Sequence, residues 1–181
     1  VCNRYTKHFD ESLEFLNRLV AASPDNGRAW QETGHNYRDM GRFDDALHAY
    51  TRACQLNPAL EASWVWVEKI CTRMGRHPQA RFARSNLERL KNTPKPLIGV
   101  ADLIAEGKLI RAEDLCRRFL KKVPHHVEAM RLLADIGLRM GVLDDAEFLL
   151  ESAVQFEPDN THVRIDYVKA LKRRQYYIKA L

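Results

Sequence analysis

The chain has 181 residues, of which 45% are hydrophobic and 29% are charged, and its 29 lysines and arginines exceed its 24 aspartates and glutamates. Enough apolar residues are present for a core, so this composition excludes an intrinsically disordered chain. No stretch approaches the roughly 18 apolar residues of a transmembrane helix. The net charge of +5 permits acidic partners without requiring nucleic acid.

The four cysteines lie far apart, at Cys2, Cys54, Cys71 and Cys116. No two of them form a CxxC pair, which excludes a zinc knuckle and a thioredoxin-like redox motif. Most lie within amphipathic patterns where a small apolar side chain fits. We therefore expect buried free thiols in a reducing, cytoplasmic compartment, in preference to disulfide bonds.

In chain order, the residue pattern repeats about every 34 residues. The glycines of four short turns lie at intervals of 34, 32 and 34 residues; they are Gly41, Gly75, Gly107 and Gly141. An alanine follows each of these glycines by five residues, so the alanines have the same intervals. Apolar residues recur at helical spacing on both sides of each turn, which predicts a helical hairpin in each repeat. A glycine with positive φ ends the first helix of such a hairpin.

The first element is an irregular start over residues 1–8, followed by a lone second helix over 9–23. We expect the four hairpins at 27–60, 61–92, 93–126 and 127–160. A first helix then begins at residue 161, and the opening of another second helix follows it up to Leu181. Both ends look like cuts through a longer array, and the start without Met favours a fragment or a processed product.

The third hairpin departs from the pattern, because Pro94 and Pro96 occupy the expected start of its first helix. Proline restricts that start to an extended or first-turn geometry, so we expect a short first helix over about 97–106. We interpret this point as a seam between two sub-arrays, 1–92 and 93–181, within one continuous solenoid.

The repeat with the clearest pattern resembles a tetratricopeptide repeat. Its matching residues are Trp30, Gly34, Tyr37, Gly41, Ala46, Tyr50, Ala53 and Pro58. The resemblance extends over essentially the whole chain and implies an all-α fold, a right-handed superhelical α-solenoid of helix-turn-helix hairpins. It also implies a protein-interaction scaffold. Since the sequence contains no catalytic motif, we expect no active site within these residues and no cofactor.

In this family the ligand groove is lined by the first helices of the hairpins, on the concave wall. Carried over to this sequence, the groove residues are Arg28, Gln31, His35, Arg38, Trp66, Lys69, Arg73, Arg131, Asp135, Arg139, Lys169, Lys172 and Arg173. The third hairpin adds the apolar residues Leu97, Ala101 and Ile104. Cations predominate, so we expect an acidic protein or peptide partner, although a solvated basic helix face explains the same residues.

Some partners are disfavoured by the same residues. Chaperone-binding members of this family hold a peptide carboxylate with a cationic clamp. The matching positions here carry no such clamp, so a co-chaperone role is not expected. These positions are Gln31, His35, Trp66, Pro94 and Ile98. Nucleic acid and membranes are not expected as partners, whereas self-association stays open. Trp66 has two interpretations, an exposed ligand anchor or packing against the adjoining hairpin.

Enzymatic motifs are not found. The carboxylate pairs Asp44-Asp45 and Asp144-Asp145 begin second helices, where capping and the helix dipole explain them. The adjacent His125 and His126 lack a third metal ligand at a fixed spacing. Segments from Leu103 onward are similar to the repeat regions that precede sulfotransferase domains in bacterial proteins. The alternative function is therefore the non-catalytic N-terminal part of a larger sulfotransferase-like enzyme.

Overall fold

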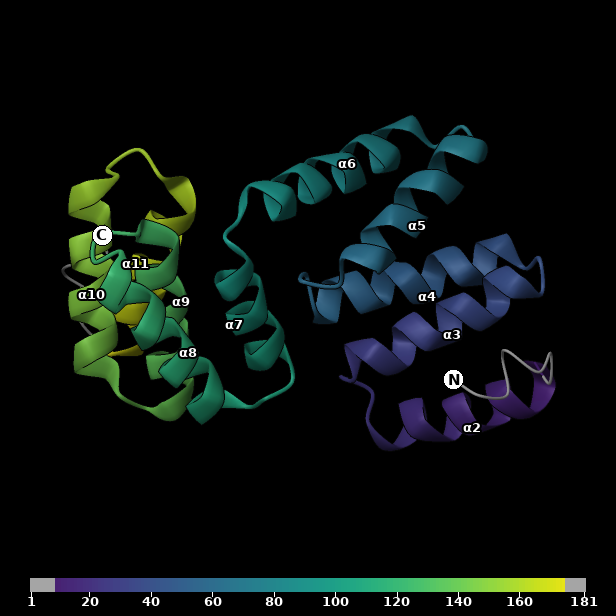
Figure 1. Cartoon of the computed structure of the whole chain (residues 1–181), viewed down its shortest axis with the longest axis horizontal. Helices are drawn as coiled ribbons and strands as arrows, with labels where there is room; N and C mark the ends of the chain where they lie inside the picture. Colours follow the sequence, from purple (N-terminus) through teal and green to yellow (C-terminus); the bar gives the residue numbers. More distant parts are fainter. Residues whose placement is uncertain (1–8, 175–181) are drawn as a thin grey trace. The chain divides into compact units, whose positions relative to one another are not determined.

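The computed structural model describes residues 9–174, and over these residues it contains ten α-helices and no strand (Figure 1). The predicted irregular start and the predicted opening of a last second helix lie outside the described residues. The chain divides between Pro94 and Lys95 into two compact units. The all-α helical-repeat fold expected from the periodicity is confirmed.

Unit 1 contains two complete helical hairpins preceded by a single helix. Its helices are α2 (Phe9–Ala22), α3 (Gly27–Asp39), α4 (Phe43–Leu56), α5 (Glu61–Arg73) and α6 (His77–Asn92). The hairpins are α3 with α4 and α5 with α6, while α2 packs on α3 and α4 packs on α5. First and second helices therefore alternate along the unit, as a stacked array of hairpins requires.

Unit 2 repeats this arrangement with two hairpins and one final first helix. Its helices are α7 (Lys95–Ala105), α8 (Leu109–Lys122), α9 (Val127–Met140), α10 (Leu143–Phe156) and α11 (Thr161–Arg173). Successive helices pack on one another, and the first helices α7, α9 and α11 also contact each other in order. These contacts form a row of first helices along one side of the unit.

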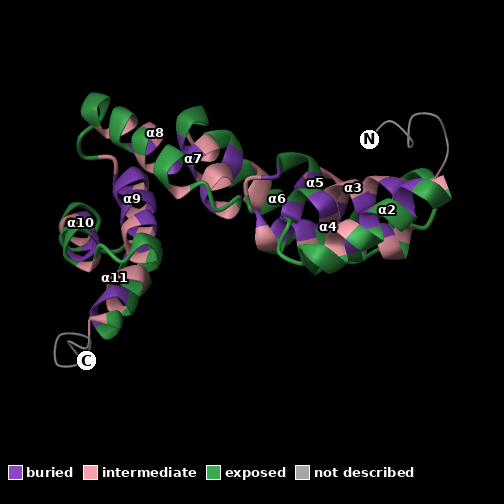
Figure 2. Cartoon of the chain, turned by 90° about the horizontal axis from the view of Figure 1, so that it is seen from below, coloured by how far each residue is buried: buried purple, intermediate pink, exposed green. Residues whose placement is uncertain are grey.

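Small residues allow the helices of a hairpin to approach closely. Gly41 ends the first hairpin turn at φ +77°, and the other three turn glycines also have positive φ, which confirms the predicted turns. Ala46 is fully buried. A Cβ on Gly34 would lie 2.7 Å from two ring carbons of Tyr50, so only glycine fits at this crossing. In both units the buried residues lie on helix faces that meet a neighbouring helix (Figure 2).

Two details of the predicted elements are wrong. The helix α4 begins at Phe43 after Arg42, whose side chain makes no capping hydrogen bond, and Asp44 and Asp45 lie in the first turn. The carboxylates can therefore favour the helix dipole but do not cap. The first helix of the third hairpin begins at Lys95 and includes Pro96, because a backbone N–H is not needed in the first turn of a helix.

A contact that the sequence pattern did not predict fixes the entry to two hairpins. The indole Nε1 of Trp30 donates a hydrogen bond to the carbonyl oxygen of Pro24 at 2.9 Å. Trp64 makes the equivalent bond to Pro58 at 3.0 Å. Each tryptophan thus holds the turn that precedes its own helix, which gives the repeated Trp and Pro a shared structural role.

Candidate functional site

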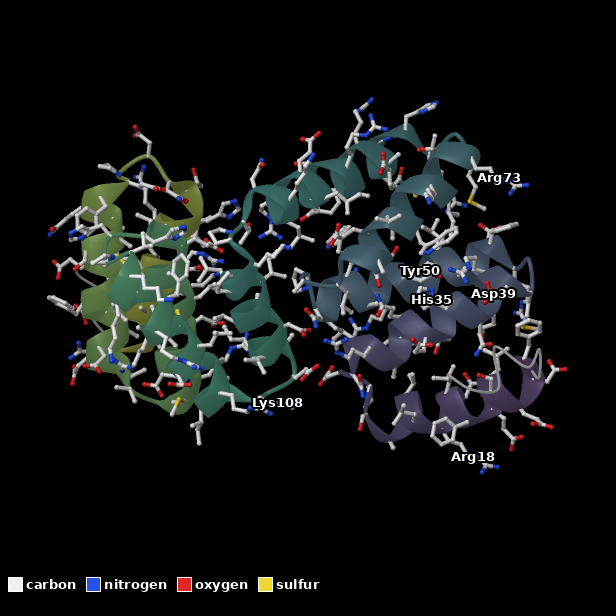
Figure 3. The ribbon with its side chains drawn as sticks, in the orientation of Figure 1. Arg18, His35, Asp39, Tyr50, Arg73 and Lys108 are labelled. Atoms are coloured by element: carbon white, nitrogen blue, oxygen red, sulfur yellow. The ribbon has the colours of Figure 1, made fainter. Side chains whose placement is uncertain are left out.

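The first helices of unit 1, α3 and α5, carry the predicted groove residues of that unit, and we call this surface the unit 1 wall. At its centre the ring of Trp66 on α5 stacks on Tyr50 of α4, with ring centroids 6.4 Å apart and an angle of 12° between the planes. Nδ1 of His35 lies 2.6 Å from the hydroxyl oxygen of Tyr50, and Figure 3 shows the two side chains together. This aromatic cluster joins three helices.

Trp66 is half-buried and packs against the preceding hairpin, as one of the two sequence interpretations predicts. The guanidinium of Arg38 lies 4.4 Å from the centre of its ring, and Nζ of Lys69 lies at 5.0 Å. Both distances are within the range of cation–π attraction. Trp66 is therefore a fixed aromatic centre surrounded by cations, not an isolated ligand anchor.

The other predicted residues of the unit 1 wall divide into linking and solvent-facing groups. Nε2 of Gln31 donates to Oγ of Ser63 at 3.0 Å and so connects α3 to α5. Arg28 is exposed in the first turn of α3. Arg73 lies over the ring of Phe43 at 4.9 Å and points away from the end of α5 (Figure 3). Within the described residues neither Lys69 nor Arg73 makes an ion pair, whereas Arg38 pairs with Asp39 at 2.5 Å.

The first helices α9 and α11 of unit 2 form the corresponding unit 2 wall, where Arg131 acts as a link between helices. Its guanidinium contacts Oε1 of Glu128 at 2.8 Å on its own helix and Oδ2 of Asp166 on α11 at 2.9 Å. Nζ of Lys169 donates to the other oxygen of Asp166 at 2.9 Å. The carboxylates of Glu128 and Asp166, which the groove prediction did not include, neutralise much of the positive charge here.

The pKa values of this network follow from its geometry. Hydrogen bonds that the Arg131 guanidinium donates to Glu128 raise its pKa, and Asp166 contributes in the same direction. Burial by itself raises the pKa of Asp166, but the hydrogen bonds from Lys169 and Arg131 together hold it below its ordinary value. Both groups therefore stay charged near neutral pH, so the ion pair between α9 and α11 is retained at that pH.

The remaining unit 2 residues are more accessible. Nε of Arg139 donates to both carboxylate oxygens of Asp135, one turn earlier on α9, at 3.2 and 3.1 Å. Lys172 and Arg173 are exposed in the last turn of α11. Within residues 9–174 neither of these two side chains makes an ion pair, and this wall is less basic than the residue count predicts.

The apolar groove residues expected from the third hairpin do not face a ligand surface. Leu97 and Ile104 of α7 are 0% and 5% exposed and belong to the hydrophobic core of unit 2, and Ala101 packs against that core. The expectation that they line the groove is wrong, because α7 is covered by both α8 and α9. On the described first helices, the accessible walls are therefore formed by α3 and α5 in unit 1 and by α9 and α11 in unit 2.

The histidines that the sequence offers as possible metal ligands have structural roles. Nδ1 of His126 caps α9 by accepting from the backbone N–H of Ala129 at 3.3 Å, and His125 packs on the ring of Phe156. Among residues 9–174 no three histidine, cysteine or carboxylate side chains are grouped to hold a metal ion. The same part of the chain has no helix long and apolar enough to cross a bilayer.

Two family models, both described as tetratricopeptide repeat, match residues 27–60 and 103–164. A curated relative is Pre-mRNA-splicing factor 6 of Saccharomyces cerevisiae, 24% identical over 170 residues that are 93% of this chain. The chain spans 16% of the length of that relative.

Solved structures of similar chains include the MamA protein, at 18% identity and a TM-score of 0.45 over 85% of each chain. Another is YrrB, described as a tetratricopeptide repeat protein with an unusual peptide-binding site, at 12% identity and a TM-score of 0.45. That match covers 92% of this chain and 87% of YrrB. The resemblance to the repeat regions that precede sulfotransferase domains stays a prediction.

Proposed function

The chain belongs to the tetratricopeptide repeat family, since the two family models together match more than half of its residues. We propose that it is a protein-interaction scaffold. Its first-helix walls bind acidic segments of protein partners. The observation that carries this proposal is the arrangement around Trp66, where a fixed aromatic ring is bordered by the exposed Lys69 and by the partly buried Arg38. Such a surface attracts carboxylates and offers an aromatic contact for the chain that carries them.

The unit 1 wall is the stronger of the two proposed surfaces. Lys69 and Arg73 are exposed there and make no ion pair within the described residues, so an acidic ligand does not have to displace an internal carboxylate. On the unit 2 wall, Arg131 is engaged by Glu128 and Asp166. Among the predicted groove residues of that wall, Lys172 and Arg173 are exposed and make no ion pair within residues 9–174.

The proposal is tested by reversing the charges of the unit 1 wall. The probe is a fluorescein-labelled twelve-residue peptide of alternating glutamate and glycine, titrated with the full chain at low salt. We expect the Lys69→Glu/Arg73→Glu variant to bind this peptide at least about tenfold more weakly than the unchanged protein, because two attractive charges become repulsive.

The matched control is the Arg81→Glu/Lys121→Glu variant, which changes the net charge equally on exposed positions of the second helices α6 and α8. We expect it to retain most of the affinity. Equal losses in both variants indicate attraction by net charge alone and contradict a specific wall. A lysine-for-glutamate peptide that binds equally well contradicts the acidic character of the ligand.

We also propose a reducing compartment such as the cytoplasm as the site of action. The support is that Cys54, Cys71 and Cys116 are buried free thiols. Such thiols persist where disulfide formation is suppressed.

A further inference from the structure

A second surface of unit 1 has the shape of a binding groove, and it lies away from the unit 1 wall. The second helices α4 and α6 border a trough whose floor is α5, with a volume of about 600 Å³. Trp64, Val67 and Cys71 of α5 line the floor. Because Trp64 and Trp66 are two residues apart on one helix, their side chains point about 200° apart, one to the trough and one to the wall.

The border of this trough carries an exposed aromatic residue. Phe82 of α6 is 65% exposed, and its ring meets the edge of Trp64 with centroids 5.8 Å apart. Along α6 the lining residues Gln79, Phe82, Asn86 and Arg89 are spaced three or four positions apart, so they share one helix face. An apolar centre with polar ends therefore extends along the trough.

The equivalent position in unit 2 is almost closed. There the cavity between α8, α9 and α10 has a volume of about 40 Å³. In the repeat register, Arg117 lies where unit 1 has Thr51 on the bordering helix, and Leu133 lies where unit 1 has Val67 on the floor. These two larger side chains narrow the space at this place in unit 2.

The charges at the two ends of the trough differ. At one end the guanidinium of Arg76, which directly precedes α6, pairs with Asp44 of α4 at 3.0 Å. At the other end Nη2 of Arg89 lies 3.5 Å from the amide oxygen of Asn86. Arg89 makes no ion pair within the described residues. Arg89 follows Arg76 by thirteen positions, which correspond to about 20 Å of helix. An occupant thus meets a neutral end, an apolar centre and a positive end.

We propose that this trough is a second docking surface, which binds an amphipathic segment of a protein partner with apolar side chains at its centre and a carboxylate at Arg89. The apolar side chains lie against Phe82 and Trp64, and the carboxylate pairs with the guanidinium of Arg89. The length of the trough suits about six extended residues or three to four helical turns. This site does not depend on the first-helix wall of the same unit.

The test uses a fluorescein-labelled ten-residue peptide with a central Leu-Phe pair flanked by glutamates, titrated with the full chain. We expect Phe82→Ala and Arg89→Glu each to weaken its binding about tenfold, as removal of a central anchor does. The matched controls are Phe148→Ala, at the same repeat position in unit 2 and 68% exposed, and Arg81→Glu, another exposed arginine of α6. We expect both controls to bind within about twofold of the unchanged protein.

Each other outcome overturns the proposal. Equal losses in Phe148→Ala and Arg81→Glu mean that the peptide binds by general apolar or charge attraction. If the peptide does not bind, an acidic amphipathic segment is the wrong occupant. If the Lys69→Glu/Arg73→Glu variant loses binding and the trough variants retain it, the peptide binds the wall, so the wall proposal stands and the trough proposal fails.

Discussion

The ring of Trp66 lies nearly parallel to the ring of Tyr50, at a centroid distance of 6.4 Å, although sixteen positions and a turn separate the two residues. Tyr50 is fully buried between the helices of its own hairpin, and Trp66 belongs to the next hairpin. The contact therefore connects the core of one repeat to the surface of the following one. It places the candidate binding wall on a rigid support.

Replacing Trp66 by alanine is expected to destabilise the protein, because the stacking on Tyr50 and the attraction to Arg38 are both lost. We expect a decrease of about 1–3 kcal/mol in the free energy of unfolding, since the ring is only half-buried. Trp66→Phe retains an aromatic ring and should lose less. Urea denaturation measures both. Phe148→Ala, at an exposed ring in unit 2, is the control, and an equal effect in both alanine variants contradicts the packing role.

Gly34→Ala is expected to cost about 1–3 kcal/mol in the free energy of unfolding, because the new methyl group overlaps the Tyr50 ring. The control is Gly99→Ala in α7, where the nearest atom is a methyl carbon of Leu115 at 3.4 Å. There the higher helix propensity of alanine offsets the contact. Thermal unfolding of both variants distinguishes them. Equal midpoints argue against close packing at the α3–α4 crossing.

The carboxylate of Asp166 is expected to stabilise unit 2 in a pH-dependent way. Its pKa is lower in the folded protein than the ordinary value of 3.8, so its contribution is complete above that value and is lost as the pH falls through the folded pKa. We expect Asp166→Asn to cost about 1–2 kcal/mol at pH 7 and progressively less below about pH 4.

The measurement is the difference in unfolding midpoint between Asp166→Asn and the unchanged protein from pH 7 to pH 3. The control is Asp159→Asn, an exposed turn residue without an ion pair among the described residues. Its difference should stay near zero throughout. A difference for Asp166→Asn that is independent of pH indicates a packing effect and not an ionic one.

The buried cysteines are expected to resist thiol reagents in the folded protein. Burial raises the pKa of the Cys54 thiol to about 12 and that of Cys116 to about 11, so almost no thiolate exists at pH 8. The Cys116 thiol also donates to the carbonyl oxygen of Ala129 at 3.2 Å. With Ellman's reagent, none of Cys54, Cys71 and Cys116 should react quickly before urea is added. Rapid reaction of any of the three contradicts the burial of these side chains.

The hairpins were predictable because their signals are local. A glycine at each turn and apolar residues at helical spacing determine where each helix ends and which face it buries. The start of α7 was not predictable from the sequence, because the effect of Pro96 depends on whether it lies in the first turn of the helix or before it. The capping role given to Asp44 and Asp45 failed for a similar reason, since one position decides between a cap and a first turn.

The candidate site was only partly predictable. The family geometry identified the first helices, and Glu128 could have been found from its spacing of three positions before Arg131. The link from Arg131 to Asp166 spans 35 positions and needs the packing of α9 against α11. The trough of unit 1 depends on side-chain volumes at equivalent repeat positions, which become meaningful only once the helices are placed.

The central claim is that acidic segments bind on the unit 1 wall around Trp66, and the indole N–H signals of the three tryptophans test it most directly. The ¹⁵N-labelled full chain is titrated with the glutamate–glycine peptide, and signals are assigned with the Trp→Phe variants. We expect the Trp66 signal to shift with saturation, with less shift at high salt, while Trp30 stays in place. No shift at Trp66 while the peptide binds would contradict the account.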